Sequence, residues 1–187
     1  VPVGKGSMLA ILGAKIEDIS DLLNSFKGKG VCEIANDNAD GQVIISGDKD
    51  SVVSFQSLLK EKKIKSIPLK VSAPFHCSLM KSAADKMSDK IKNINFRKPK
   101  HSILSNVTAK IEKNPENIKK LLINQIFSTV KWRETIINIS KEGVSNFVEI
   151  GPGKVLTGMV KRTVKNINCF SINSIDDIKN LKNEFNK

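Results

Sequence analysis

The sequence of 187 residues predicts a mixed α/β fold, and three observations support this prediction. Short apolar runs rich in Val and Ile alternate with segments in which apolar residues recur every three or four positions, a spacing typical of helices. Clusters of Gly, Asn, Asp and Pro separate these segments. Hydrophobic residues make up 40% of the chain and charged residues 27%, which is enough apolar material for one domain or two small ones.

Residues 1–72 are expected to form a small domain of four strands and two helices. Its strands are short apolar runs, at 7–12, 31–35, 42–46 and 64–71. Its helices have apolar residues at helical spacing, over 16–26 and from the predicted N-cap Asp48 to about residue 62. The polar stretch Asn36–Gly41 predicts the loop between the two middle strands. The resulting order, βαββαβ, is the ferredoxin-like pattern.

Helices and strands also alternate in residues 73–187, which predicts a parallel sheet covered by helices. A short strand followed by a loop is predicted around 102–108, and further strands are predicted at 146–150 and 167–172. The predicted helices lie at 78–94, 114–127, 132–141 and 154–165, with a last helix after residue 173. Two of these helices have clear start signals. Asn114 can cap the helix that Pro115 begins, and Ser174 with Asp177 forms a capping box.

The formal net charge is +12, and lysine supplies most of it, because only three of the 31 basic residues are arginine. A positive field of this kind speeds the encounter with an acidic protein or with nucleic acid. Alternatively, abundant Lys, Asn and Ile together with the absence of Tyr indicate an AT-rich genome, with lysines spread over a solvated surface. We favour the second explanation.

Several classes of protein are disfavoured by the sequence. Cys32, Cys77 and Cys169 are far apart and form no C-x-x-C pair, which argues against a disulfide framework or a zinc site and for a reducing compartment. His76 and His101 share no helical spacing and have no nearby carboxylate, so we expect no metal. The longest apolar runs fall short of the roughly 18 residues that a membrane span needs, and the first residues do not resemble a signal peptide, so we expect neither a membrane protein nor a secreted one.

His76 stands between a predicted strand and a predicted helix, in the stretch VSAPFHCSLM. Ligands of open α/β sheets bind beyond the carboxyl ends of strands, and Pro74 keeps the residue before it extended, so the imidazole should be well positioned. It could act as a general base toward a hydroxyl or a thiol. It could also be an ordinary loop histidine, and the residues alone favour this second interpretation, because no nucleophile motif accompanies it.

Gly151-Pro152-Gly153-Lys154 resembles a helix start that binds an anion, since glycines expose backbone N–H groups there. The G-x-x-x-x-G-K-[ST] spacing of a phosphate-binding loop is not found in the sequence. We therefore interpret this stretch as a tight turn.

Six stretches, taken together, resemble one family. They are PVGKGSMLAILG, EIANDNADGQVIISG, VSAPFHCSLMKSAADKM, ILSNVTA, VKWRETI and EIGPGKVLTGMVKR, in this order along the sequence. Their order and spacing are similar to those of malonyl-CoA:acyl carrier protein transacylases of type II fatty acid synthesis. The resemblance implies an α/β-hydrolase-like acyltransferase domain with an inserted ferredoxin-like subdomain. Residues 1–72 would be that subdomain, and residues 73–187 the C-terminal part of the large one.

The resemblance also implies roles for individual residues. His76 would be the catalytic base, and the backbone carbonyl of Gln125 would orient its ring. Four further residues would line the substrate cleft: Asn38, Gln42, Phe75 and Asn106. The family's nucleophilic serine, its malonyl-binding arginine and a glutamine of the oxyanion hole have no counterpart in this sequence and are expected upstream of Val1. We therefore expect the 187 residues alone to be nearly inactive.

The implied reaction moves a malonyl group from malonyl-CoA to the pantetheine thiol of acyl carrier protein, through an acyl-serine and without a cofactor. The implied partner is acidic, which suits the positive charge. We expect a monomer in a plastid or in bacterial cytoplasm. The alternative hypothesis is a basic ferredoxin-like module that binds nucleic acid or an acidic protein. Sheets that read RNA stack bases on aromatic residues, and residues 31–47 contain none, so we expect no nucleic acid partner.

Overall fold

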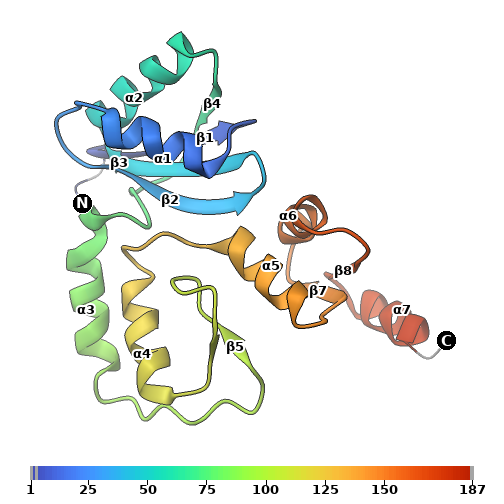
Figure 1. Cartoon of the computed structure of the whole chain (residues 1–187). Coiled ribbons are helices and arrows are strands. Elements are labelled where there is room, and N and C mark those ends of the chain that lie inside the picture. Colours follow the sequence, from blue (N-terminus) through green and yellow to red (C-terminus); the bar gives the residue numbers. More distant parts are fainter. Residues whose placement is uncertain (1, 3, 186–187) are drawn as a thin grey trace. The chain divides into compact units, whose positions relative to one another are not determined.

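The computed structural model describes residues 2 and 4–185, with side chains to residue 184, and shows a mixed α/β fold (Figure 1). The chain divides into two compact units, Val1–Thr135 and Ile136–Lys187. The boundary expected after residue 72 remains a prediction. Within the described residues, every helix is too short or too polar to span a bilayer.

A four-stranded sheet with two helices forms the first part of the first unit. Its elements are β1 (Gly6–Leu12), α1 (Ile16–Ser25), β2 (Cys32–Ala39), β3 (Gln42–Asp48), α2 (Lys49–Glu61) and β4 (Lys65–Pro68). The strand order is β2-β3-β1-β4, and all neighbouring strands are antiparallel. This is the arrangement of the ferredoxin-like pattern, so the predicted order of elements is confirmed.

The core of this sheet follows from the alternation of side chains along β1. Leu9 and Ile11 point to one face and pack against residues of α1 and α2, including Ile19 and Phe55, which are fully buried. On the opposite face, Met8 and Ala10 of β1 form a smaller cluster with Ala35 of β2 and Ile44 of β3. Both helices therefore cover the same face of the sheet, and the other face is available to the rest of the unit.

One local prediction in this part is wrong, and a second is confirmed only in position. The stretch Asn36–Gly41 is not a loop, because β2 continues through Ala39 and only Asp40 and Gly41 form the turn. The strand continues because its N–H and C=O groups find partners on both sides, including a bridge from Asn36 to Val130. Asp48 is the N-cap residue of α2, as predicted. Its side chain makes no capping bond within the described structure, and Oδ2 instead accepts a hydrogen bond from Val31 N–H at 2.7 Å.

The remainder of the first unit holds two helices that lie side by side and a short hairpin (Figure 1). Its elements are η1 (Ser78–Met80), α3 (Lys81–Ile91), β5 (Ile103–Leu104), β6 (Ile111–Glu112) and α4 (Pro115–Asn124). Asn114 caps α4 as predicted, since its Oδ1 accepts from Asn117 N–H at 2.9 Å. The helix ends before Phe127, however, and β6 was not predicted. A two-residue strand gives too short a pattern to recognise.

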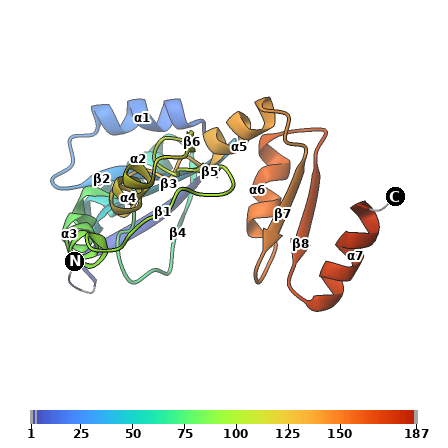
Figure 2. The ribbon, with the colours of Figure 1, turned by 90° about the horizontal axis from the view of Figure 1, so that it is seen from below.

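The second unit is a pair of parallel strands with helices. Its elements are β7 (Asn146–Ile150), α6 (Val155–Thr163), β8 (Asn168–Ile172) and α7 (Ile175–Phe185). Figure 2 shows the two strands side by side between α6 and α7. The predicted parallel pairing is confirmed for β7 and β8. It is wrong for the strand expected near residues 102–108, because β5 pairs antiparallel with β6 in a separate sheet. The capping box is confirmed, because Asp177 N–H donates to Ser174 Oγ and Ser174 N–H donates to Asp177 Oδ2. Helix α5 (Trp132–Lys141) begins in the first unit and ends in the second.

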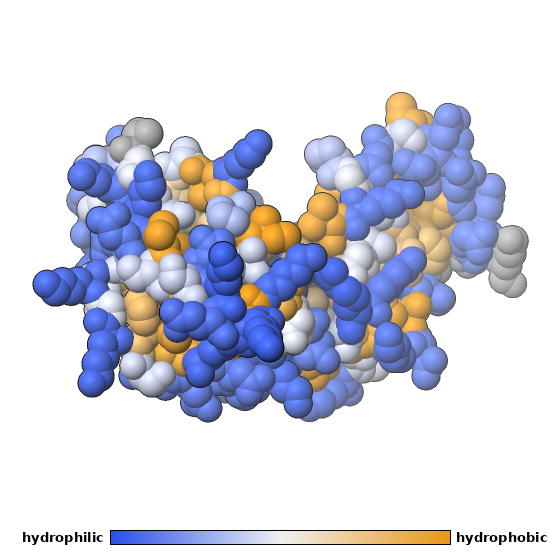
Figure 3. Space-filling view, turned by 90° about the horizontal axis from the view of Figure 1, so that it is seen from above, coloured by the Kyte–Doolittle hydropathy of each residue, from blue (hydrophilic) through white to orange (hydrophobic). Residues whose placement is uncertain are grey.

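Hydrophilic residues cover most of the surface of the face that Figure 3 shows, with apolar residues scattered among them. A protein with 40% hydrophobic residues is expected to leave some apolar residues exposed, so single ones need no special explanation.

Candidate active site

The candidate catalytic histidine lies in a turn that we call the histidine turn, Pro74–Ser78. His76 has φ = 59°, in the left-handed region that few residues other than glycine adopt. Its Nδ1 lies 2.7 Å from the backbone oxygen of Gln125. A carbonyl oxygen can only accept, so Nδ1 carries the hydrogen and donates it. In the neutral ring, Nε2 then keeps a lone pair and can accept a proton.

Gln125 can offer its carbonyl because it stands at the C-terminal end of α4, where backbone carbonyl groups lack partners within the helix. Its side chain is also held, since Oε1 accepts from Asn106 Nδ2 at 3.2 Å. Asn106 in turn accepts from Lys131 N–H through its own backbone oxygen, at 2.8 Å. The structure therefore brings together three of the predicted site residues, His76, Gln125 and Asn106.

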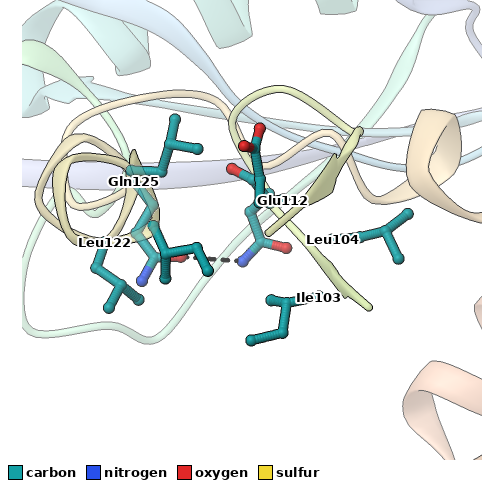
Figure 4. A pocket seen from close by; sticks show the side chains of 9 residues that line it. Ile103, Leu104, Glu112, Leu122 and Gln125 are labelled. Carbon is teal, nitrogen blue, oxygen red and sulfur yellow. Dashed lines mark hydrogen bonds between the residues drawn. The ribbon is translucent and has the colours of Figure 1, made fainter. Parts of the chain in front are cut away.

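A small cavity of about 70 Å³ lies beside the side chain of Gln125 (Figure 4). The hairpin β5–β6 and α4 form its walls, and its lining is mostly apolar: Ile103, Leu104, Ser105, Asn106, Glu112, Ile118, Leu121, Leu122 and Gln125. Both carboxylate oxygens of Glu112 already accept hydrogen bonds, from Thr108 and Asn117. This cavity is too small for an acyl-CoA, and we interpret it as a small packing defect beside the Gln125 side chain.

A larger, open cavity of about 520 Å³ includes His76. It is lined by α1, by β2 and by the segment after α4, through the residues Ser20, Leu23, Asn24, Cys32, Glu33, Ile34, His76, Phe127, Ser128 and Thr129. Its volume lies within the range of small-molecule sites. Hydroxyl, amide and carboxylate groups share its lining with apolar side chains, so it can hold a polar ligand next to the imidazole.

The other predicted cleft residues are less closely associated with His76. Phe75 is adjacent in sequence, and 39% of its surface is exposed. Asn38 stands at an irregularity of β2 between Asp37 and Ala39, and Gln42 pairs with Ala39. In the described part of the protein, neither Asn38 nor Gln42 lines the cavity that contains His76. Their roles, like those of the other site residues, remain predictions.

Sequence reasoning missed an ion pair in this region. Arg133 Nε lies 2.9 and 3.0 Å from the two carboxylate oxygens of Asp37, whose side chain is only 6% exposed. Burial raises the pKa of Asp37, although Arg133 opposes the shift. The hydrogen bond that Arg133 donates to the Asp37 carboxylate raises the pKa of Arg133. A buried carboxylate in a strand could have been suspected from the alternation of residues 35–39, had that stretch been recognised as a strand.

Other groups in the structure are already engaged. The Glu149 carboxylate accepts from Leu156 and Thr157 N–H at 3.1 and 2.7 Å, so the helix start after Gly151-Pro152-Gly153 already has an anion, from the protein itself. These hydrogen bonds lower the pKa of Glu149. Among the described residues, no group of three or more His, Cys, Asp and Glu side chains is arranged to hold a metal ion. Burial raises the pKa of Cys32 to about 12, so its thiol is a poor nucleophile near neutral pH.

Comparison with known proteins identifies the family to which this chain and its fold belong. Residues 17–184 match the model of the acyl transferase domain, and the chain belongs to that family. Among the most similar relatives are malonyl CoA-acyl carrier protein transacylases. The one from Haemophilus influenzae is 39% identical over 176 residues, which cover 94% of this chain and 56% of the relative.

Solved structures agree with this assignment. The acyl carrier protein S-malonyltransferase of Vibrio cholerae superposes with a TM-score of 0.93 at 38% identity, over 97% of this chain and 60% of that one. A malonyl-transacylase in complex with a type II PKS acyl-carrier protein gives a TM-score of 0.92 at 37% identity, over 98% and 60% of the two chains. The predicted family and its α/β acyltransferase fold are confirmed. The chain spans somewhat more than half the length of these proteins.

Proposed function

We propose that this chain is part of an enzyme that transfers a malonyl group from malonyl-CoA to the pantetheine thiol of acyl carrier protein. The observation that carries the proposal is the hydrogen bond from His76 Nδ1 to the Gln125 carbonyl, in a member of the acyl transferase family. This bond fixes the tautomer in which Nε2 is a base. The histidine therefore needs no carboxylate to orient its ring. In this proposal His76 is the general base and acid, and Gln125 positions it.

The first half-reaction forms an acyl-serine. Nε2 of His76 takes the proton of a serine hydroxyl while the serine oxygen attacks the thioester carbonyl of malonyl-CoA. A C–O bond forms, the C–S bond to coenzyme A breaks, and His76 gives the proton to the departing thiolate. We propose that the serine, the malonyl-binding arginine and the oxyanion-hole donors belong to the part of the relatives' length that these 187 residues do not cover.

The second half-reaction reverses these roles. The pantetheine thiol gives its proton to His76 as its sulfur attacks the acyl-serine, and the serine oxygen takes the proton back as it leaves. No electrons are exchanged in either step, so we propose that no cofactor is required. Asn106, Phe75, Asn38 and Gln42 would line the path of the substrate, with Asn106 supported best because it bonds to Gln125.

We propose that the protein partner is acyl carrier protein. One similar solved structure contains a malonyl-transacylase together with its acyl-carrier protein. The formal charge of +12 would favour encounter with an acidic carrier. The alternative is a basic binding module for nucleic acid or an acidic protein. Binding of nucleic acid gains no support, because the sequence of β2 and β3 holds no aromatic residue for stacking. We further propose a reducing compartment, either bacterial cytoplasm, as the bacterial relatives suggest, or a plastid.

The test is a malonyl-transfer assay with holo acyl carrier protein. It uses the full polypeptide that the gene encodes, as the parent and as the His76→Ala variant. We expect the variant to lose a factor on the order of 10² to 10⁴ in rate, the usual effect of removing a general base. A variant in which the distant His101 is replaced by Ala should keep the parent rate. Undiminished transfer by the His76→Ala variant would rule out the role proposed for His76.

A further inference from the structure

Glu33 of β2 binds the residue that ends the histidine turn. Its Oε2 accepts from the backbone N–H of Ser78 at 2.8 Å, and its Oε1 accepts from the hydroxyl of Ser78 at 2.6 Å. Both bonds have an ionised acceptor, which makes them stronger than bonds between neutral groups. The two residues are 45 positions apart, so the contact ties the sheet to the turn.

The place of Ser78 explains why a carboxylate suits this position. Ser78 begins η1, and α3 follows without a break to Ile91. Within the described structure, Cys77 at the N-cap makes no capping bond with its side chain. The first N–H groups of a helix need acceptors, and negative charge is favourable at that end. Glu33 supplies both from another element of the fold.

The sheet also holds the turn at two other points, but through uncharged groups. The Pro74 ring packs directly on Gly6 of β1. The Cys77 thiol is fully buried, 3.6 Å from Ser46 Oγ of β3. Glu33 therefore makes the one charged contact among these three anchors, and it does so at the end of the turn that leads into α3.

The conformation of His76 needs such anchors. A left-handed backbone is unfavourable for a residue with a Cβ atom and persists only where the surroundings enforce it. On one side the ring of His76 is bonded to the Gln125 carbonyl, and two residues later Glu33 fixes Ser78. Both His76 and Glu33 line the same cavity.

We propose that Glu33 is a positioning residue for His76: its carboxylate fixes the start of the helix that follows the turn, and thereby keeps the imidazole Nδ1–H directed at the Gln125 carbonyl. Glu33 needs no contact with substrate for this role. The geometric part of the proposal stands on the contacts alone, whereas its catalytic consequence rests on the proposed function.

The geometric part is tested by ¹⁵N NMR of the histidine rings in the 187-residue protein. The sequence has only two histidines, and the exposed His101 serves as an internal reference. The variants are Glu33→Ala, Glu33→Gln and, as a control, Glu61→Gln at the exposed end of α2. We expect Glu33→Ala to lower the ratio of Nδ1–H to Nε2–H tautomer of His76 several-fold. Glu33→Gln should give a tautomer ratio between those of the parent and Glu33→Ala, because its amide oxygen can still accept one hydrogen bond.

Ser78→Ala keeps the bond to the backbone N–H and loses only the hydroxyl bond, so it should give a smaller change in the same direction. It also serves as the test if Glu33→Ala does not fold. The Glu61→Gln control and the His101 signals should match the parent in every case. The proposal is overturned if Glu33→Ala folds and its His76 tautomer ratio equals that of the parent. If Glu33→Ala does not fold, an unchanged His76 tautomer ratio in Ser78→Ala overturns it.

The catalytic consequence is measured in the full polypeptide that the gene encodes. Glu33→Ala should lower kcat between about 10-fold and 100-fold, as expected for a displaced catalytic group, with KM for malonyl-CoA changed less than about two-fold. Glu33→Gln should recover part of the rate. Undiminished malonyl transfer by the His76→Ala variant would refute the role proposed for His76, whatever Glu33 does. A strong effect of His76→Ala with none of Glu33→Ala would refute only the positioning role.

Discussion

The ring of Pro74, at the start of the histidine turn, occupies the space that a Cβ atom on Gly6 of β1 would need. Both Cγ and Cδ of the ring lie closer to that position than two unbonded carbon atoms can approach, and Pro74 is fully buried. The first strand of the sheet therefore carries a glycine where the Pro74 ring of the turn packs against it. A side chain at this position would push the turn, with His76 in it, away from the sheet.

The Gly6→Ala variant should accordingly be less stable by about 1–3 kcal/mol, the usual cost of an extra methyl group in a packed site. Chemical denaturation of the 187-residue protein measures this loss. Gly158 of α6 provides a matched control, because among the described residues no atom outside its chain neighbours and the local helix backbone lies within 4 Å of the Cβ position there. Gly158→Ala should be neutral or stabilising by up to about 1 kcal/mol, from helix propensity. Equal effects of the two substitutions would show that the contact with Pro74 does not matter.

Arg133→Gln should destabilise the protein by about 3 kcal/mol, because it leaves the buried carboxylate of Asp37 without its cation. Breaking a buried ion pair usually costs about 3–5 kcal/mol. We expect the lower end of this range, since the Arg133 side chain is 26% exposed and water can partly replace it. Asp37→Asn in the Arg133→Gln background removes the buried charge and should restore part of the loss. A double variant no more stable than Arg133→Gln alone would contradict this explanation.

The loss caused by Arg133→Gln should also depend on pH, with a definite sign. Burial already raises the pKa of Asp37 in the folded protein, and removal of Arg133 takes away the group that opposes the shift. A carboxyl whose pKa is higher when folded binds more protons folded than unfolded, so stability falls as pH rises from the ordinary carboxyl pKa toward the folded one. The Arg133→Gln variant should therefore lose least stability in acid and most stability near neutral pH. Denaturation curves from about pH 3 to pH 7 measure this, and a loss independent of pH would contradict it.

Cys32 should react very slowly with alkylating reagents in the folded protein. Its pKa is raised to about 12, chiefly by burial. At pH 8 this lowers the thiolate fraction by a factor on the order of 10³ relative to an unfolded thiol. Mass spectrometry after iodoacetamide treatment, with and without denaturant, gives the rate at each cysteine. Alkylation of Cys32 at similar rates in both conditions would show that the thiol is not protected.

The side chain of Gln125 should matter little to His76, because the histidine contacts its backbone oxygen. Gln125→Ala removes the bond from Asn106 and should cost about 1 kcal/mol while leaving the His76 tautomer unchanged. Gln125→Pro, which alters the backbone where α4 ends and removes the N–H that bonds to Leu121, should disturb the tautomer. ¹⁵N NMR of the His76 ring separates the two. A changed tautomer in Gln125→Ala would mean that the side chain, not the carbonyl, orients the ring.

Most of the fold could be predicted from the sequence because its helices and strands are long enough to show their period. The ferredoxin-like order, the cap at Asn114 and the Ser174–Asp177 capping box all depend on local patterns, and the structure confirms them. The errors occurred where tertiary contacts decide the conformation. Residues 36–39 have the composition of a turn, yet the segment after α4 pairs with them and extends β2.

Less of the candidate site could be predicted from the residues alone. They identified His76 as a candidate, but its partner Gln125 is 49 positions away and acts through its backbone, so no side-chain motif reveals it. That contact was expected only from the family resemblance. Glu33 and Arg133 were missed for a similar reason, because each pairs with a residue 45 or 96 positions distant. Contacts of this kind are set by how β2 packs against the rest of the unit.

Catalysis by His76 requires that its imidazole donates from Nδ1 and presents Nε2 as a base. Long-range ¹H–¹⁵N correlation spectra of the unmodified 187-residue protein at about pH 8 measure this directly, with the exposed His101 as the reference in the same spectrum. We expect His76 to show a protonated Nδ1 and an unprotonated Nε2, unlike the Nε2–H form that predominates in a solvated histidine. A His76 ring with the proton on Nε2, or with the same tautomer mixture as His101, would contradict the proposed mechanism.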